Sequence, residues 1–298
     1  MRNAIIWNAV KSRKFDHMTL RRFGLLAMVF ISSCTPAIKS QGSLTAPTTY
    51  NALESIITRT PSVAASPIPF IPTPDLINRV CSPLKSETLS ELPEIITQAY
   101  SPSRPGFDEG HPGIDFSFFR RKDLLSIDGV PVLSVLDGVV VTILVDKLPY
   151  GHAIIIETPL ENISKELLQR IDLPDIQPTM EPDPKFNCMP PEGLQPPSSQ
   201  SMSIYILYAH LKHPVSLSVG EEVKCGQEIG AVGDSGKEYS TNPHLHFETR
   251  IGPSGARFDS MAYYTVDSTA AERYNYCVWR VSNTFQSFDP MLLLSAQE

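Results

Sequence analysis

Short apolar runs, cut by Gly, Pro and Asp, follow one another from about Leu92 onward and constrain the fold more than any other feature. Many of these runs are rich in Val, Ile, Tyr and Phe, the residues that favour strands, and turn-forming residues separate them. The runs are Gly113–Phe119, Val130–Val145, Ala153–Thr158, Ser203–Ala209, Glu222–Val232 and His244–Ile251. We therefore expect a mainly all-β fold, a compact antiparallel β-sheet or sandwich.

Two longer stretches interrupt these runs and are expected to be loops elaborated on the β core. Residues 159–202 begin with a pattern typical of a short amphipathic helix, with one side formed by Ile163, Leu167, Leu168 and Ile171. Eight prolines then lie between Pro174 and Pro197, so the rest of this insertion is expected to be irregular. Residues 252–286 are rich in aromatic side chains, which form either a glycan platform or a small core: Phe258, Tyr263, Tyr264, Tyr274, Tyr276 and Trp279.

The N-terminal region has the features of an export signal. Residues 1–33 contain six basic side chains and one acidic side chain, and they include the apolar run Phe23–Ile31. That run is too short to span a bilayer, which takes about 20 residues as a helix. It ends in Ser32-Ser33-Cys34, which resembles the lipobox of bacterial lipoproteins; the alternative is a cleaved secretory signal with an incidental cysteine.

The lipobox resemblance implies a lipoprotein signal peptide over residues 1–33, with either Met1 or Met18 as the true start. It also implies lipidation of Cys34, and hence an exported protein anchored to the membrane surface of the bacterial cell envelope, facing the cell wall. Residues 34–85 are rich in Ser, Thr, Pro and Ala, and such a composition is typical of an extended linker. The folded domain is expected over residues 86–298.

Charge and cysteine content narrow the possibilities further. The 298 residues carry a formal net charge of −7, and no basic footprint for nucleic acid is present. The cysteines outside the signal form an even set, which an oxidising compartment would allow to pair or which could remain as buried thiols. Their three possible pairings stay open: Cys81, Cys188, Cys225 and Cys277.

Histidines and one aspartate form the constellation that indicates chemistry. His244 and His246 alternate along a strand-like run, so both imidazoles project from one face. His111 and Asp115 lie where a turn enters a strand, and His210 lies at the end of an apolar strand. Two histidines and one aspartate can bind Zn²⁺ and leave a fourth position open for water, as catalytic zinc sites require. Two further histidines would remain to move protons or stabilise an oxyanion.

Three ordered motifs, with the segments between them, resemble the lysostaphin/LytM-type zinc metallopeptidases, which cleave peptides of bacterial cell walls. The motifs are GHPGIDF (110–116), YAHL (208–211) and PHLHFE (243–248). The segments PVLSVLDGVVVTI (131–143) and GEEVKCGQEIGAVGDSG (220–236) resemble the strand pairs of the family. The resemblance covers about residues 92–160, 203–251 and 287–294. One departure is Asn242, which stands where the family usually has glycine.

The resemblance implies that His111, Asp115 and His246 bind Zn²⁺, whereas His210 and His244 form a catalytic pair. It further implies a substrate groove on the sheet, with the two insertions beside it. The expected function is a zinc-dependent endopeptidase that hydrolyses stem or cross-bridge peptides of peptidoglycan through metal-activated water.

Two alternatives follow from the same fold. One is a non-catalytic lipoprotein regulator that binds and activates another cell-wall hydrolase; regulators of this kind typically lack some site residues, and this chain keeps all five. The other is a wall-binding lipoprotein with structural zinc, against which three protein ligands rather than four argue. The bond that is cleaved, the membrane that carries the anchor and the oligomeric state stay open.

Overall fold

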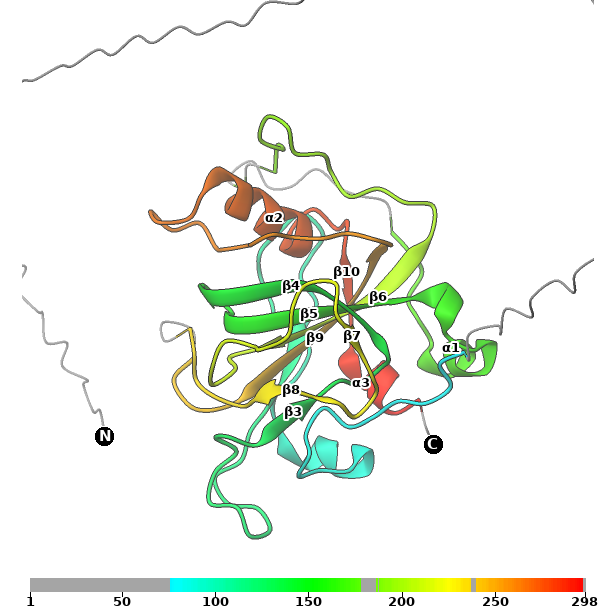
Figure 1. Ribbon diagram of the computed structural model, residues 1–298, viewed down its shortest axis with the longest axis vertical. Coiled ribbons are helices and arrows are strands. Elements are labelled where there is room, and N and C mark those ends of the chain that lie inside the picture. Colours follow the sequence, from blue (N-terminus) through cyan, green and yellow to red (C-terminus); the bar gives the residue numbers. More distant parts are fainter. Residues whose placement is uncertain (1–75, 178–185, 187, 237–239, 297–298) are drawn as a thin grey trace, which may run out of the picture. The chain divides into compact units, whose positions relative to one another are not determined.

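The computed structural model describes residues 76–177, 186, 188–236 and 240–296 (Figure 1). The expected signal peptide, Cys34 and residues 34–75 of the expected linker lie outside this part. The described residues form mainly antiparallel strands, which confirms the all-β class. Among them, no helix is both long and apolar enough to cross a membrane.

An antiparallel sheet of eight strands is the centre of the described part. Its order is β1 (Ile96–Gln98), β2 (Gly113–Phe116), β9 (Leu245–Pro253), β6 (Met202–Ala209), β5 (Gly151–Pro159), β4 (Gly138–Lys147) and β7 (Glu222–Val223), with β10 (Gln286–Phe288) also paired to β9. A second sheet pairs β3 (Pro131–Leu133) with β8 (Glu228–Ala231). Each expected apolar run therefore contains at least one strand.

Alternation along the central strands gives the large sheet two covered faces. On β6, Ile206 and Tyr208 belong to one core cluster, whereas Tyr205 and Leu207 belong to another. The first cluster also contains apolar side chains of β3 and β8, of the 3₁₀ helix η1 (Leu89–Ile95), and of the helices α1 (Lys165–Ile171) and α3 (Pro290–Leu294). The second cluster includes side chains from the insertion 252–286. This second face is the one that holds the site described below.

The first insertion begins as expected. After the short 3₁₀ helix η2 (Leu160–Asn162), α1 starts at a Ser164 cap whose hydroxyl accepts a hydrogen bond from the backbone of Leu167. Leu167 and Ile171 are buried, which confirms the expected apolar side of this helix. The helix ends at Asp172, which adopts a left-handed conformation.

The second insertion is not only a loop, contrary to expectation. It contains the helix α2 (Ala270–Arg280), which begins with a capping box between Thr269 and Glu272. Residues 274–279 are all buried, whereas the less buried Arg273 and Arg280 lie on one side of the helix. The aromatic side chains of this insertion were expected to form either a glycan platform or a small core. Four of them belong to the core cluster of the second face: Phe258, Tyr274, Tyr276 and Trp279.

The four cysteines form two disulfides, Cys81–Cys225 and Cys188–Cys277. The first of them attaches the end of the expected linker to the folded domain. Val80 and Leu84 are also buried in the core, so the folded part includes residues that we assigned to the linker, and its boundary lies before residue 85. The composition of residues 34–85 as a whole indicates a linker, but the apolar Val80 and Leu84 near its end pack into the core. The second disulfide joins the two insertions.

Candidate metal centre

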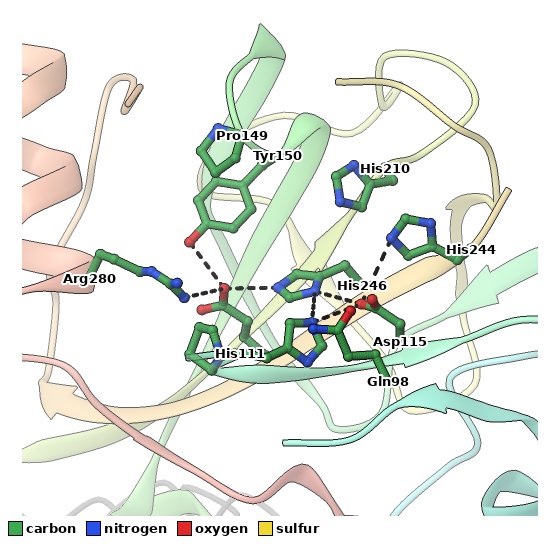
Figure 2. Close-up of a pocket in the computed structure, with 11 residues that line it drawn as sticks. Gln98, His111, Asp115, Pro149, Tyr150, His210, His244, His246 and Arg280 are labelled. Atoms are coloured by element: carbon green, nitrogen blue, oxygen red, sulfur yellow. Dashed lines mark hydrogen bonds and ion pairs between the residues drawn. The ribbon is translucent and has the colours of Figure 1, made fainter. Parts of the chain in front are cut away.

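The pairing of β2 with β9 sets Asp115 directly opposite His246. His111 lies just before β2, where its backbone pairs with Ser101. Three donor atoms consequently face one another: His111 Nε2 lies 3.1 Å from Asp115 Oδ1 and 3.0 Å from His246 Nδ1, and His246 Nδ1 lies 2.8 Å from Asp115 Oδ1. Figure 2 shows the three side chains converging. All three are partly or fully buried, and together they could hold a metal ion.

The outer ring nitrogens orient the two histidines of this group. His111 Nδ1 donates to the backbone carbonyl of Ala99 over 3.1 Å, and His246 Nε2 donates to Glu248 Oε1 over 3.0 Å. Since these acceptors require a proton on the outer nitrogen, the inner nitrogen of each ring is the one that would bind a metal ion, once any proton on it has been displaced. Histidines that bind metals are commonly held in this way.

The electrostatics of the group favour a cation. Burial lowers the pKa of His246, but the carboxylates of Asp115 and Glu248 outweigh burial and raise it to about 9. Burial would raise the pKa of Asp115, yet hydrogen bonds from His111 and His246 hold it well below its usual range. The centre therefore stabilises positive charge between its side chains. Two imidazole nitrogens and one carboxylate oxygen are also a donor set that suits Zn²⁺.

His210 and His244 lie beside this group, with their ring centroids 4.5 Å apart. His210 follows β6 directly, and its φ of 58° turns the chain so that Nδ1 donates to the carbonyl of Ser235 over 2.7 Å. His244 Nδ1 donates to the carbonyl of Asn242 over 2.8 Å, and its Nε2 lies 3.8 Å from Asp115 Oδ1. Each ring therefore keeps Nε2 as an acceptor.

Two further details concern these histidines. Burial, followed by the nearby charges of His246 and His244, lowers the pKa of His210 to about 3, so this ring is neutral. Asn242, which stands where glycine was expected, does not have a positive φ, so its backbone conformation does not require glycine. Its contribution is the carbonyl that orients His244.

All five expected site residues line one cavity of about 220 Å³. Sequence reasoning missed the six other residues of its wall, among them the polar side chains of Tyr150, Glu248 and Arg280. Glu248 could have been found, because it follows His246 by two positions and so projects from the same strand face. Tyr150 and Arg280 come from a turn and from the second insertion, and no motif marks them.

Part of the sequence matches the model of a known protein family. Residues 199–259 match the model of Peptidase family M23. The matched segment contains His210, His244 and His246, while His111 and Asp115 precede it. The resemblance to M23 peptidases of the lysostaphin type is thus confirmed over this segment. No curated protein matches the chain.

Solved structures give similarities of modest size. The catalytic domain of the antimicrobial peptidase lysostaphin from Staphylococcus simulans is 21% identical, with a TM-score of 0.35, over 70% of this chain and 98% of that one. A zinc-containing peptidase from Vibrio cholerae is 25% identical, with a TM-score of 0.29, over 52% of this chain. This chain spans only 32% of the length of that peptidase. The catalytic domain of a mutant of the prophage-encoded M23 protein EnpA from Enterococcus faecalis is 21% identical, with a TM-score of 0.30, over 54% of this chain and 82% of that one.

Proposed function

Since this chain resembles the M23 peptidases, we propose that it is a zinc-dependent endopeptidase that hydrolyses peptide bonds of bacterial peptidoglycan. The observation that carries the proposal is the convergence of His111, Asp115 and His246 beside a second histidine pair in one cavity. A peptidase family match over residues 199–259 supports the reaction class. Stem or cross-bridge peptides are the proposed substrates.

Metal binding falls to His111, Asp115 and His246. Two neutral nitrogens and one carboxylate oxygen leave a tetrahedral position for other ligands, as in catalytic rather than structural zinc sites. The chemistry supplied by bound Zn²⁺ is Lewis acidity, which polarises an amide carbonyl and lowers the pKa of water toward 7. The carbonyl of Ala99 and the carboxylate of Glu248 keep both rings turned toward the ion.

Proton transfer falls to His210 and His244. Their Nδ1 atoms are held by the carbonyls of Ser235 and Asn242, so the Nε2 atoms can accept a proton from the attacking water and return it to the leaving amine. The same two rings can donate hydrogen bonds to the oxyanion once protonated. The low pKa of His210 keeps its ring neutral before reaction, so its Nε2 can accept a hydrogen bond from water.

The test is mass spectrometry of fragments that the purified zinc-loaded chain releases from cell-wall sacculi. New peptide termini should appear and identify the bond. The control is His210→Ala, which keeps all three metal ligands and should release no such fragments. Intact sacculi with folded, zinc-loaded wild type would reject the endopeptidase and favour a non-catalytic regulator.

We also propose that Cys34 carries a lipid that anchors the exported protein to the membrane surface facing the cell wall. The support is the run Phe23–Ile31 followed by Ser32-Ser33-Cys34. Covalent acyl chains would hold the enzyme near its insoluble substrate, since each buried CH₂ contributes about 0.8 kcal/mol. Growth with a labelled fatty acid should label the wild type and leave Cys34→Ser unlabelled; a labelled Cys34→Ser protein would reject the assignment.

A further inference from the structure

We propose that the insertion 252–286 is part of the metal centre, with Arg280 as a positioning residue that acts through Glu248 on His246. This inference rests on the metal site of the proposed function and deepens it. The insertion would thus do more than line the cavity. It would fix the orientation of one metal ligand through a buried chain of charges.

The chain of charges begins at Glu248, whose side chain is completely buried. Its Oε1 accepts hydrogen bonds from His246 Nε2 and from the Tyr150 hydroxyl, each over 3.0 Å. Its Oε2 accepts from Arg250 Nε over 2.9 Å. A buried carboxylate is tolerated only when cations and hydrogen bonds compensate the loss of water. The contact that orients His246 therefore depends on the cations that hold Glu248.

The insertion holds the first of these cations. Arg250 Nη1 donates to the carbonyl of Trp279 over 2.7 Å and to that of Phe285 over 2.9 Å. Its guanidinium also lies 4.9 Å from the centre of the Trp279 ring. Both Trp279 and Phe285 belong to the insertion. Arg250 is thereby fixed with its charge against Glu248.

The insertion also supplies the second cation. Arg280, the last residue of α2, brings Nη1 to 3.9 Å from Glu248 Oε1, and Figure 2 shows its guanidinium directed at that carboxylate. Arg280 Nε donates to Asp108 Oδ1 over 2.8 Å, and the Tyr276 hydroxyl donates to Asp108 Oδ2 over 2.9 Å. Asp108 lies three residues before His111. Arg280 is therefore held between two carboxylates that flank the metal centre.

The physical consequence is a coupling between α2 and the metal ligand. Without Arg280, Glu248 would keep only Arg250 as an arginine partner, and Asp108 would keep only the Tyr276 hydroxyl of the two partners named above. Groups that orient a ligating histidine from behind typically change metal affinity by about 10–100-fold when they are removed. Because Arg280 acts on Glu248, which holds the His246 ring, its effect should appear in metal binding itself.

The experiment measures the Kd of Zn²⁺ for the full chain by competition with a chromophoric chelator. Arg280→Gln should weaken binding by about tenfold or more, whereas Arg280→Lys should recover most of the affinity because it retains the charge. The visible absorption of the Co²⁺-loaded protein should change in Arg280→Gln, since the environment of His246 changes. The matched control is Arg273→Gln, which alters the same helix at a residue that contacts Ser268 rather than Glu248.

A milder variant keeps the inference testable if Arg280→Gln does not fold. Tyr276→Phe removes only the hydroxyl that holds Asp108, and it should lower zinc affinity less than Arg280→Gln would. Wild-type affinity and an unchanged Co²⁺ spectrum in both Arg280→Gln and Tyr276→Phe, or in Tyr276→Phe alone if only it folds, would overturn the positioning role alone. A wild type that binds no zinc would overturn the metal centre, and this inference with it.

Discussion

The histidines of the site differ in which ring nitrogen they use, and backbone carbonyls decide this for three of them. His111, His210 and His244 each donate Nδ1 to a carbonyl, those of Ala99, Ser235 and Asn242. His246 instead donates Nε2 to a carboxylate. A sequence motif identifies a histidine but not its tautomer, because the partner carbonyls come from distant segments. In each of the four rings, the other nitrogen is therefore the one left to face the cavity.

Two substitutions separate metal binding from turnover. His246→Ala removes a donor atom and should abolish stoichiometric zinc binding, whereas His210→Ala should keep zinc and lose peptide hydrolysis. Metal analysis after dialysis, together with the sacculus assay, checks both. Equal zinc content in wild type and His246→Ala would contradict the ligand assignment, and full activity of His210→Ala would contradict the proton-transfer role.

At the scale of elements, the strands were more accessible to prediction than the helices. The run Ser203–Ala209 became β6 with only one residue added, because its apolar side chains alternate between two buried faces. Helix α1 was predictable from one apolar side. Helix α2 was missed, although Arg273 and Arg280 recur on one side and the spacing of Thr269 and Glu272 is a capping-box signal that was available.

The approach of β5 to the loop that carries Ser235 gives a prediction about a turn. Gly151 has a φ of 67°, and a Cβ there would collide with the backbone of Ser235, whose carbonyl orients His210. Gly151→Ala should therefore destabilise the fold by about 1–3 kcal/mol beyond its backbone strain and reduce activity. Chemical denaturation and the sacculus assay measure both effects.

Gly220→Ala is the matched control for this substitution. Gly220 also has a positive φ, of 92°, but no atom lies within 4 Å of a Cβ built there. The backbone strain is therefore comparable, and only the collision is absent. Equal losses of stability and activity in Gly151→Ala and Gly220→Ala would show that crowding against Ser235 is unimportant.

For the molecule as a whole, sequence reasoning placed the five site residues without revealing how the surroundings support them. The motifs are local and carry His111, Asp115, His210, His244 and His246, which one cavity brings together. Of the supporting charges, Glu248 and Arg250 follow His246 along β9, whereas only the tertiary fold makes Asp108 and Arg280 neighbours of the site. The cysteine pairings were open for the same reason, since Cys81 and Cys225 are 144 residues apart.

The Cys81–Cys225 disulfide gives a prediction about global stability. Closing a loop of 144 residues restricts the unfolded chain, an effect of up to about 5 kcal/mol on chain entropy. The double variant Cys81→Ser/Cys225→Ser should unfold at a lower temperature than wild type under oxidising conditions. Reductant cleaves both disulfides of the wild type and the remaining Cys188–Cys277 disulfide of the double variant. The two reduced proteins should therefore melt at similar temperatures. A melting temperature unchanged by the double substitution would contradict a stabilising bridge.

Strand β9 is paired on both sides and presents His246, Glu248 and Arg250 in alternate positions on one face. Leu245 and Phe247 fill the opposite core. A proposed metal ligand, the carboxylate that holds it and the cation that holds the carboxylate therefore lie two residues apart on the same face of the strand. A single-residue insertion or deletion within β9 would turn this whole series into the apolar core. Substitutions can change individual side chains of β9, whereas a change in its length would alter which face those side chains occupy.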